Sequence, residues 1–205
     1  HYIFKIIMSL IQKIEDKHLT TKKSKLVFYK FQDTPLLDTC VEEITSQLDE
    51  YPPIKIYGKI CHQRRCIGFF SNKSIGYQYS GQMASSKPMT SGLTQLLKLV
   101  NKEFNAEFNG ILINKYKNGS DYISAHSDDE RNLDNIGVVA ISYGATRKFR
   151  IRDKKTREKI IDIPMTSGLI IKMDGDFQKK YTHEVPIERR VKEERISFTF
   201  RKHNK

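Results

Sequence analysis

Two histidines and an aspartate are the residues of this chain best suited to hold a metal ion. His126 and Asp128 are separated by one residue in "HSD", and His183 stands apart in "YTHEVP". On a strand, side chains two residues apart share a face, so His126 and Asp128 can bind one ion. Two imidazoles and one carboxylate form the facial triad that leaves positions open on Fe(II) for a co-substrate and O2. The spacing alone does not distinguish this site from three ordinary polar residues.

A second group of residues is suited to bind carboxylates. In "RISFTFR" (195–201), Arg195 and Arg201 lie on the strand face opposite to the three apolar residues between them. Each guanidinium can pair bidentately with a carboxylate, so the two arginines could hold the two ends of a short dicarboxylate. In "GILINKYKNG", Asn114 and Tyr116 also share a face and offer an amide and a phenol donor. The alternative is a strand with a solvated basic face.

The elements that must position these residues are concentrated in the second half of the chain. From residue 109 onwards, short β-rich runs such as "GILINKY", "IGVVAISYG", "KFRIR" and "SGLIIKM" are separated by turn residues. This pattern predicts a barrel, sandwich or jelly roll. Before it, residues 36–48 and 91–104 have apolar side chains at helical spacing, and residues 20–25 read as a basic arm or loop. The fold class is therefore α+β, mainly β, with supporting N-terminal helices.

The composition of the chain limits the kinds of molecule that it can be expected to bind. The chain has 205 residues, 38% of them hydrophobic, and carries a net charge of +12. This length fits one domain with its own core. No apolar run approaches the ~20 residues of a membrane span, so we expect no membrane contact. The positive charge favours a polyanionic partner such as nucleic acid, the alternative being a merely solubilising surface.

The cysteines indicate the compartment. Cys61 and Cys66 flank His62 in "CHQRRC", but no second cluster of cysteine and histidine completes a zinc site. We therefore expect free thiols, which favour a reducing, intracellular location. The sequence does not distinguish nucleus from cytoplasm. The first ten residues do not predict a signal peptide, because Lys5 interrupts their short apolar stretch.

The order of the motifs is more specific than each motif alone: N-x-Y, H-x-D, a distant histidine, then R-x5-R on the last strand. With this order, and in the segments "LINKYKNGSDYISAHSDDE", "VAISYGATRKFRIR" and "RISFTFRKH", residues 53–202 resemble the AlkB family of iron- and 2-oxoglutarate-dependent dioxygenases. The resemblance is strongest to the members that repair duplex DNA. It implies a double-stranded β-helix, or jelly roll. It also implies Fe(II) as cofactor, with 2-oxoglutarate and O2 as co-substrates.

The resemblance implies a role for each residue of the site. The iron ligands would be His126, Asp128 and His183. Asn114, Tyr116 and Arg195 would bind the far carboxylate of 2-oxoglutarate, with Arg201 near its iron-bound end. The implied reaction is oxidative demethylation of 1-methyladenine and 3-methylcytosine in DNA, with release of formaldehyde. The flipped base would be contacted by Tyr77, Tyr79, Asp129 and Glu130.

The resemblance also assigns residues to the nucleic acid outside the pocket. Tyr57 stands where the duplex-acting relatives have an aromatic wedge, and the alternation before Gly58 predicts the tip of a hairpin. The alternative is that Tyr57 caps the core beneath the hairpin. Basic residues that would grip phosphates are Arg64, Arg65, Lys154, Lys155, Arg157, Arg189 and Arg190. Glu188 departs from this pattern, because the relatives have a basic residue there.

These interpretations divide the chain into two regions. Residues 1–52 would form an N-terminal arm and helical region, and residues 53–205 nucleotide-recognition hairpins plus the dioxygenase jelly-roll core. Both would belong to one compact domain that acts as a monomer on methylated DNA. One alternative is an RNA demethylase with the same active site. Another is a protein or metabolite hydroxylase sharing the facial triad. A non-enzymatic nucleic-acid binder is disfavoured by the intact set of candidate ligands.

Overall fold

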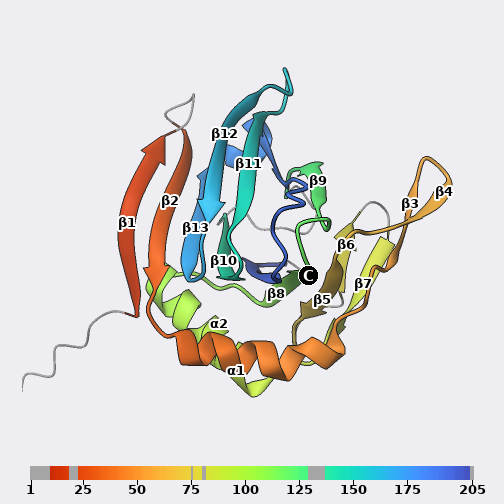
Figure 1. Cartoon of the computed structure of the whole chain (residues 1–205). Coiled ribbons are helices and arrows are strands. Elements are labelled where there is room, and N and C mark those ends of the chain that lie inside the picture. Colours follow the sequence, from red (N-terminus) through yellow and green to blue (C-terminus); the bar gives the residue numbers. More distant parts are fainter. Residues whose placement is uncertain (1–9, 19–22, 75, 80–81, 129–136, 204–205) are drawn as a thin grey trace, which may run out of the picture.

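The computed structural model describes residues 10–18, 23–74, 76–79, 82–128 and 137–203. Two sheets and a separate hairpin account for the strands (Figure 1). In spatial order, the nine-stranded sheet contains β1 (Ile11–His18), β2 (Ser24–Phe31), β13 (Leu169–Gly175), β10 (Val138–Gly144), β15 (Arg195–Arg201), β8 (Gly110–Tyr116), β5 (Cys66–Phe70), β7 (Gln82–Lys87) and β6 (Gly76–Tyr79). The four-stranded sheet contains β12 (Lys159–Met165), β11 (Arg147–Asp153), β14 (Tyr181–Val185) and β9 (Ile123–His126).

The two sheets pack face to face through an apolar core. Side chains from β10 and β13, including Val138 and Ile171, meet side chains from β11 and β12, including Ile151 and Met165. Neighbouring strands are antiparallel except for β5 and β7, which pair in parallel. Two antiparallel sheets packed in this way form the predicted jelly roll, and the α+β, mainly β class is confirmed.

Helices cover the other face of the large sheet, as the helical spacing of their apolar residues predicted (Figure 1). Helix α1 (Thr34–Ile44) begins where the Asp33 carboxylate accepts a hydrogen bond from the Leu36 amide. It continues into a short 3-10 turn, η1 (Thr45–Gln47). Helix α2 (Ser91–Phe104) buries Leu93, Leu96 and Val100 against the same core as the α1 face. A short helix, α3 (Phe177–Lys180), precedes β14.

The last strand separates its two faces as predicted. Ile196, Phe198 and Phe200 join the core between the large sheet and the helices. Arg195 and Arg201 therefore point to the opposite face, between the two sheets, where the cavity described below lies. Among the described helices, none has the length and apolar character needed to cross a bilayer.

The N-terminal region contains the expected helix α1, but also two strands that the sequence did not predict. Residues 24 and 25 of the predicted basic arm are the first residues of β2, which pairs antiparallel with β13. Strand β1 pairs in turn with β2 at the edge of the large sheet. Leu26, Val27 and Phe28 are all buried, so their apolar run belongs to the sheet core. Part of the region 1–52 is thus integrated with the jelly roll.

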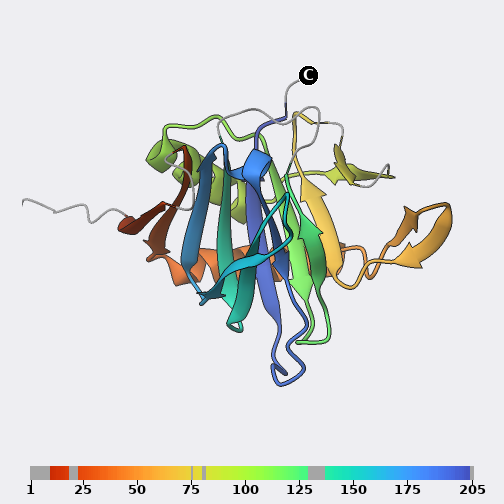
Figure 2. The same cartoon turned by 90° about the horizontal axis from the view of Figure 1, so that it is seen from above.

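A hairpin of β3 (Pro53–Ile56) and β4 (Lys59–His62) projects from the body of the protein (Figures 1 and 2). Its tip is Tyr57-Gly58, with φ angles of 46° and 79°. Two successive positive φ values are typical of a type I′ turn, whose twist matches that of the flanking strands. Tyr57 is fully exposed, at 101%. The alternative in which Tyr57 caps the core beneath the hairpin is therefore wrong.

Candidate active site

His126, Asp128 and His183 come together between the two sheets. His183 on β14 lies directly opposite His126 on β9, and Asp128 follows β9 by two residues. Potential ligand atoms of the three side chains all lie within 4.8 Å of one another. Asp128 Oδ2 is 3.5 Å from His183 Nε2, and Asp128 Oδ1 is 4.0 Å from His126 Nε2. Two ligands of one ion at ~2.1 Å each lie at most about 4.2 Å apart. Both separations are within this limit.

The hydrogen bonds of the triad leave ligand atoms available. His126 Nδ1 lies 2.8 Å from the Ser124 carbonyl oxygen. Because a carbonyl can only accept, Nδ1 carries the proton and Nε2 keeps a lone pair. Within the described part of the chain, Asp128 Oδ2 and His183 Nδ1 are buried without a hydrogen-bond partner. An orphaned carboxylate oxygen beside two imidazoles fits a divalent cation such as Fe(II).

The electrostatics favour the metal-binding protonation states. Burial, followed by the proximity of His126, lowers the pKa of His183 to about 3. Burial also lowers the pKa of His126. Burial alone would raise the pKa of Asp128, but the Arg201 guanidinium, and then the two histidines, outweigh it and hold that pKa well below its usual range. Two neutral imidazoles and one ionised carboxylate are the forms that a metal ion requires.

A cavity adjoins the triad and contains all four residues expected to bind 2-oxoglutarate. Its apolar wall includes Phe149, Met165, Ile171 and Met173, and its polar wall includes Asn114, Tyr116, Arg195 and Arg201. The four polar residues lie on the neighbouring strands β8 and β15, with Arg195 opposite Tyr116. The structure therefore brings the expected metal ligands and the expected 2-oxoglutarate ligands to one cavity.

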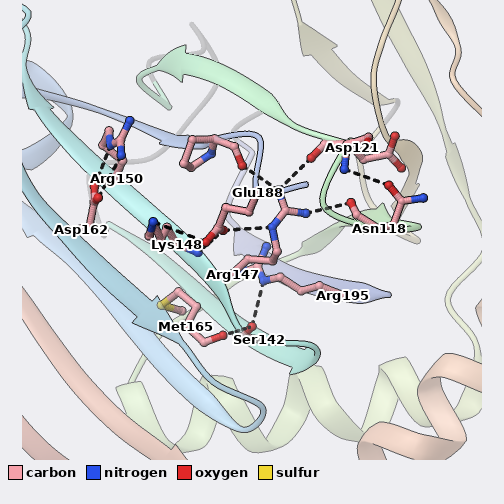
Figure 3. Close-up of polar contacts among 12 residues, drawn as sticks. Asn118, Asp121, Ser142, Arg147, Lys148, Arg150, Asp162, Met165, Glu188 and Arg195 are labelled. Carbon is pink, nitrogen blue, oxygen red and sulfur yellow. Dashed lines mark hydrogen bonds and ion pairs between the residues drawn. The ribbon is translucent and has the colours of Figure 1, made fainter. Parts of the chain in front are cut away.

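Arg195 is a buried cation without an acidic partner among the described residues. It is 3% exposed, and its Nε donates to Ser142 Oγ at 3.0 Å (Figure 3). Its guanidinium carbon lies 5.5 Å from the centre of the Tyr116 ring. Burial lowers the pKa of Arg195, as expected for a cation removed from water. A carboxylate entering the cavity would supply the missing charge.

Arg147, which the sequence analysis did not single out, organises the loops around this end of the cavity (Figure 3). Its side chain is fully buried. Its guanidinium donates hydrogen bonds to the Glu188 carboxylate and to the carbonyl oxygens of Asn118, Asp121 and Pro186. Glu188 thus faces inward rather than replacing a phosphate-binding residue. The alternation of Arg147 with buried Phe149 and Ile151 was the sequence signal for its inward position.

Arg64 and Arg65, two adjacent residues expected to contact DNA phosphates, point in different directions. The Arg64 side chain is 52% exposed and lies 4.0 Å from Asp121. Arg65 is 3% exposed, and its Nε donates to Asn114 Oδ1 at 2.8 Å. In this structure Arg65 is thus buried against Asn114, whereas Arg64 is open to solvent. The Arg65 side chain is directed inward, toward Asn114, because the two residues share one face of the paired strands.

The other expected nucleic-acid residues lie on the outer surface. Lys154, Lys155 and Arg157 are in the exposed turn between β11 and β12, and Arg189 and Arg190 are exposed in the loop before β15. A groove of about 500 Å³ is lined by Ser124, Ala125, Arg152, Lys154, Arg157 and Thr182. It runs beside β9, the strand that carries His126. Cations and hydroxyl groups of this kind are suited to phosphate contacts.

The residues expected to contact the base are only partly described. Tyr77 and Tyr79 lie in β6, which pairs with β7. Asp129 and Glu130 lie outside the described residues.

Known proteins with similar sequences include relatives of the AlkB family. The human protein named DNA oxidative demethylase ALKBH2 is 30% identical over 157 residues, covering 73% of this chain and 60% of the human protein. The bovine alpha-ketoglutarate-dependent dioxygenase alkB homolog 3 is 33% identical over 137 residues, covering 62% of this chain and 48% of the bovine protein. The chain thus spans less than two thirds of either relative. These similarities confirm the predicted relationship to the AlkB family.

A solved structure supports the fold, and a family match supports the class. The structure of OsALKBH1 has a TM-score of 0.61 and 16% identity to this chain, covering 91% of this chain and 100% of that one. Residues 27–201 match the 2OG-Fe(II) oxygenase superfamily, which is named for Fe(II) and 2-oxoglutarate. The chain therefore belongs to the 2OG-Fe(II) oxygenase superfamily.

Proposed function

We propose that this protein is an oxidative demethylase of N-methylated bases in DNA, acting as a monomer on 1-methyladenine and 3-methylcytosine. The observation that carries the proposal is the position of Arg195, a buried cation without an acidic partner among the described residues. It lies in the cavity that also contains His126, Asp128 and His183. A metal triad beside a carboxylate-binding pocket is the arrangement that an oxygenase using 2-oxoglutarate requires.

In this proposal, the three triad residues hold Fe(II), and Arg195 pairs with the distal carboxylate of 2-oxoglutarate. Asn114 and Tyr116 add an amide and a phenol donor to the same carboxylate. When bound, Fe(II) with 2-oxoglutarate and O2 supplies the oxidation of an N-methyl group to N-hydroxymethyl, as 2-oxoglutarate becomes succinate and CO2. The hydroxymethyl group then leaves as formaldehyde: its C–N bond breaks, the hydroxyl proton is released, and the ring nitrogen of the base keeps the electron pair.

The remaining cavity residues control position and water. Arg201 donates to Asp128 Oδ1 at 2.6 Å, which keeps this carboxylate ionised and fixed in orientation. His183 is stacked on Phe149, with ring centroids 5.0 Å apart, so its plane is held by packing. Apolar side chains such as Met165 and Met173 exclude water from the pocket. A dry, pre-organised pocket strengthens the charge interactions that orient the co-substrate.

Duplex DNA is the proposed substrate because of the surfaces beside the pocket. The exposed Tyr57 at the tip of the projecting hairpin can stack into a duplex and fill the gap left by a flipped base. The basic groove at Lys154 and Arg157 can hold the backbone of the flipped strand. Tyr77, Tyr79, Asp129 and Glu130 are the proposed contacts of the base itself. The two relatives compared above are named a DNA demethylase and an alkB homologue.

The test is a demethylation assay with the purified chain, Fe(II), 2-oxoglutarate and O2. Oligonucleotides containing 1-methyladenine or 3-methylcytosine would be compared as single- and double-stranded DNA and as RNA. We expect stoichiometric formaldehyde and succinate with DNA, and none with the His183→Ala variant. Faster turnover of RNA than of both DNA forms would replace the DNA proposal by an RNA demethylase. Succinate formation without acceleration by any methylated strand would reject a nucleic-acid substrate.

A further inference from the structure

Arg65 and Arg64 are adjacent in sequence but have different environments. Arg65 is 3% exposed, whereas the Arg64 side chain is 52% exposed. The next strand, β5, pairs with β8 so that Ile67 lies opposite Asn114. Because Arg65 precedes Ile67 by two residues, it shares the strand face of Asn114 and points between the sheets. Its Nε reaches Asn114 Oδ1 at 2.8 Å.

This contact decides which way the Asn114 amide faces. A guanidinium has donors and no acceptor, so only the amide oxygen of Asn114 can face Arg65. The amide nitrogen is then on the other side. A carboxylate has acceptors and no donor, so it can be bound by the amide nitrogen and is repelled by the amide oxygen. With Arg65 in place, only one of the two amide orientations is compatible with both partners.

Asn114 belongs to the wall of the cavity, whereas Arg65 is absent from the described residues that form this wall. Arg65 meets this wall through its hydrogen bond to the Asn114 amide oxygen. An arginine in this position acts through its neighbour rather than by contact with the co-substrate. Second-layer hydrogen bonds of this kind fix the orientation of the groups that do touch a ligand.

We propose that Arg65 is a positioning residue for 2-oxoglutarate: it holds the Asn114 amide with its NH2 group toward the distal carboxylate. This inference rests on the proposed function, in which Asn114 binds that carboxylate. Without Arg65 the amide can turn over and present its oxygen to the carboxylate. The affinity for 2-oxoglutarate then falls, although every residue that touches the co-substrate is still present.

The test compares Arg65→Met with Arg64→Met, two variants that remove the same group from adjacent positions. Binding of 2-oxoglutarate would be measured by calorimetry with Mn(II) in place of Fe(II), so that no turnover occurs. We expect Arg65→Met to raise the Kd for 2-oxoglutarate about tenfold, the loss of one charge-assisted hydrogen bond. Arg64→Met should leave this Kd unchanged. Arg65→Lys, which retains a donor, should recover part of the affinity.

A double-mutant cycle separates positioning from a general effect on folding. Asn114→Ala should itself weaken 2-oxoglutarate binding, and adding Arg65→Met to it should cause no further loss. Thermal unfolding and Mn(II) affinity, measured on each variant without 2-oxoglutarate, report whether the site is intact. Equal losses from Arg65→Met with and without Asn114 would overturn the proposal.

Two further outcomes are distinguishable. If wild type binds 2-oxoglutarate and Arg65→Met binds it equally well, the positioning role is rejected while the proposed function stands. If Arg65→Met weakened DNA binding as much as Arg64→Met and left the Kd for 2-oxoglutarate unchanged, Arg65 would be a nucleic-acid contact and not a positioning residue. If wild type with Mn(II) does not bind 2-oxoglutarate at all, the proposed function itself fails.

Discussion

Arg201 Nη2 lies 2.6 Å from Asp128 Oδ1, and this ion pair joins the two sheets of the jelly roll. Arg201 is the last residue of β15 in the large sheet, and Asp128 follows β9 in the small sheet. Both side chains are almost completely buried, so neither charge can be hydrated if the other is removed. The same pair therefore contributes to the fold and to the state of a candidate metal ligand.

Replacing Arg201 should weaken metal binding and stability together. Arg201→Met leaves the Asp128 carboxylate buried without its guanidinium, so its pKa rises and metal affinity should fall about 10- to 100-fold. Removing one partner of a buried ion pair also costs about 3–5 kcal/mol of unfolding free energy. Mn(II) titration and urea unfolding measure the two effects. Unchanged Mn(II) affinity in Arg201→Met would show that Asp128 does not depend on this pair.

Removing His183 should abolish metal binding without unfolding the protein. His183→Ala leaves two of three candidate ligands, and we expect loss of turnover and of tight Mn(II) binding. His62→Ala is the matched control, because His62 is exposed on β4 and remote from the triad in the fold. Circular dichroism would verify that both variants keep the strand content of the parent. Mn(II) binding by His183→Ala at wild-type affinity would contradict the triad.

Arg195→Lys should raise the 2-oxoglutarate concentration needed for half-maximal rate. A point charge replaces a planar fork, and the lost bidentate contact is worth about 1.5–3 kcal/mol, or about a 10- to 100-fold change. Steady-state rates at varied 2-oxoglutarate measure it. Arg147→Lys is the contrast: its bonds go to Glu188 and loop carbonyls, so it should lower the Tm instead. An unchanged requirement in Arg195→Lys would mean that another residue binds the carboxylate.

Tyr57→Ala should reduce activity on duplex DNA and spare single strands. A stacked ring recovers about 1–3 kcal/mol of the cost of opening a base pair, so the duplex rate should fall about tenfold or more. Because Tyr57 is fully exposed at the hairpin tip, its removal should not change the Tm. The measurement compares one methylated strand before and after annealing to its complement. If Tyr57→Ala lowered the demethylation rate equally on single-stranded and duplex DNA, Tyr57 would not act by stacking into the duplex.

The contact between helix α1 and the large sheet should be sensitive to alkali. The Tyr143 hydroxyl donates to Asp38 Oδ1 at 2.5 Å, and this hydrogen bond, with burial, raises the pKa of Tyr143 to about 12. An unfolded tyrosine titrates near 10. The folded state therefore binds more protons between these values, and the stabilisation is present below pH ~10 and lost as the pH rises toward ~12. Tyr143→Phe should show a shallower fall of Tm between pH ~10 and ~12. If Tm fell equally steeply with pH in the parent and in Tyr143→Phe, the Tyr143–Asp38 hydrogen bond would not be the cause of the alkaline sensitivity.

Several features of the site follow from the sequence alone. The alternation in 195–201 determined that Arg195 and Arg201 share a face, and the structure places both in the cavity. The one-residue spacing in "HSD" likewise determined that His126 and Asp128 can face one ion. The Tyr57-Gly58 pair indicated a hairpin tip. Each of these is a local property, because the two-residue period of a strand fixes the relative directions of nearby side chains.

Only the tertiary structure decided how these local pieces meet. His183 faces His126 because β14 pairs with β9 in one particular register, and a shift by one residue would turn it away. The register of β5 on β8 turned Arg65 inward and left Arg64 in solvent, although the two residues are chemically identical. The pairing of β2 with β13 drew part of the N-terminal region into the sheet. Strand partners and registers far apart in sequence are selected by the packing of the whole core, which no local pattern encodes.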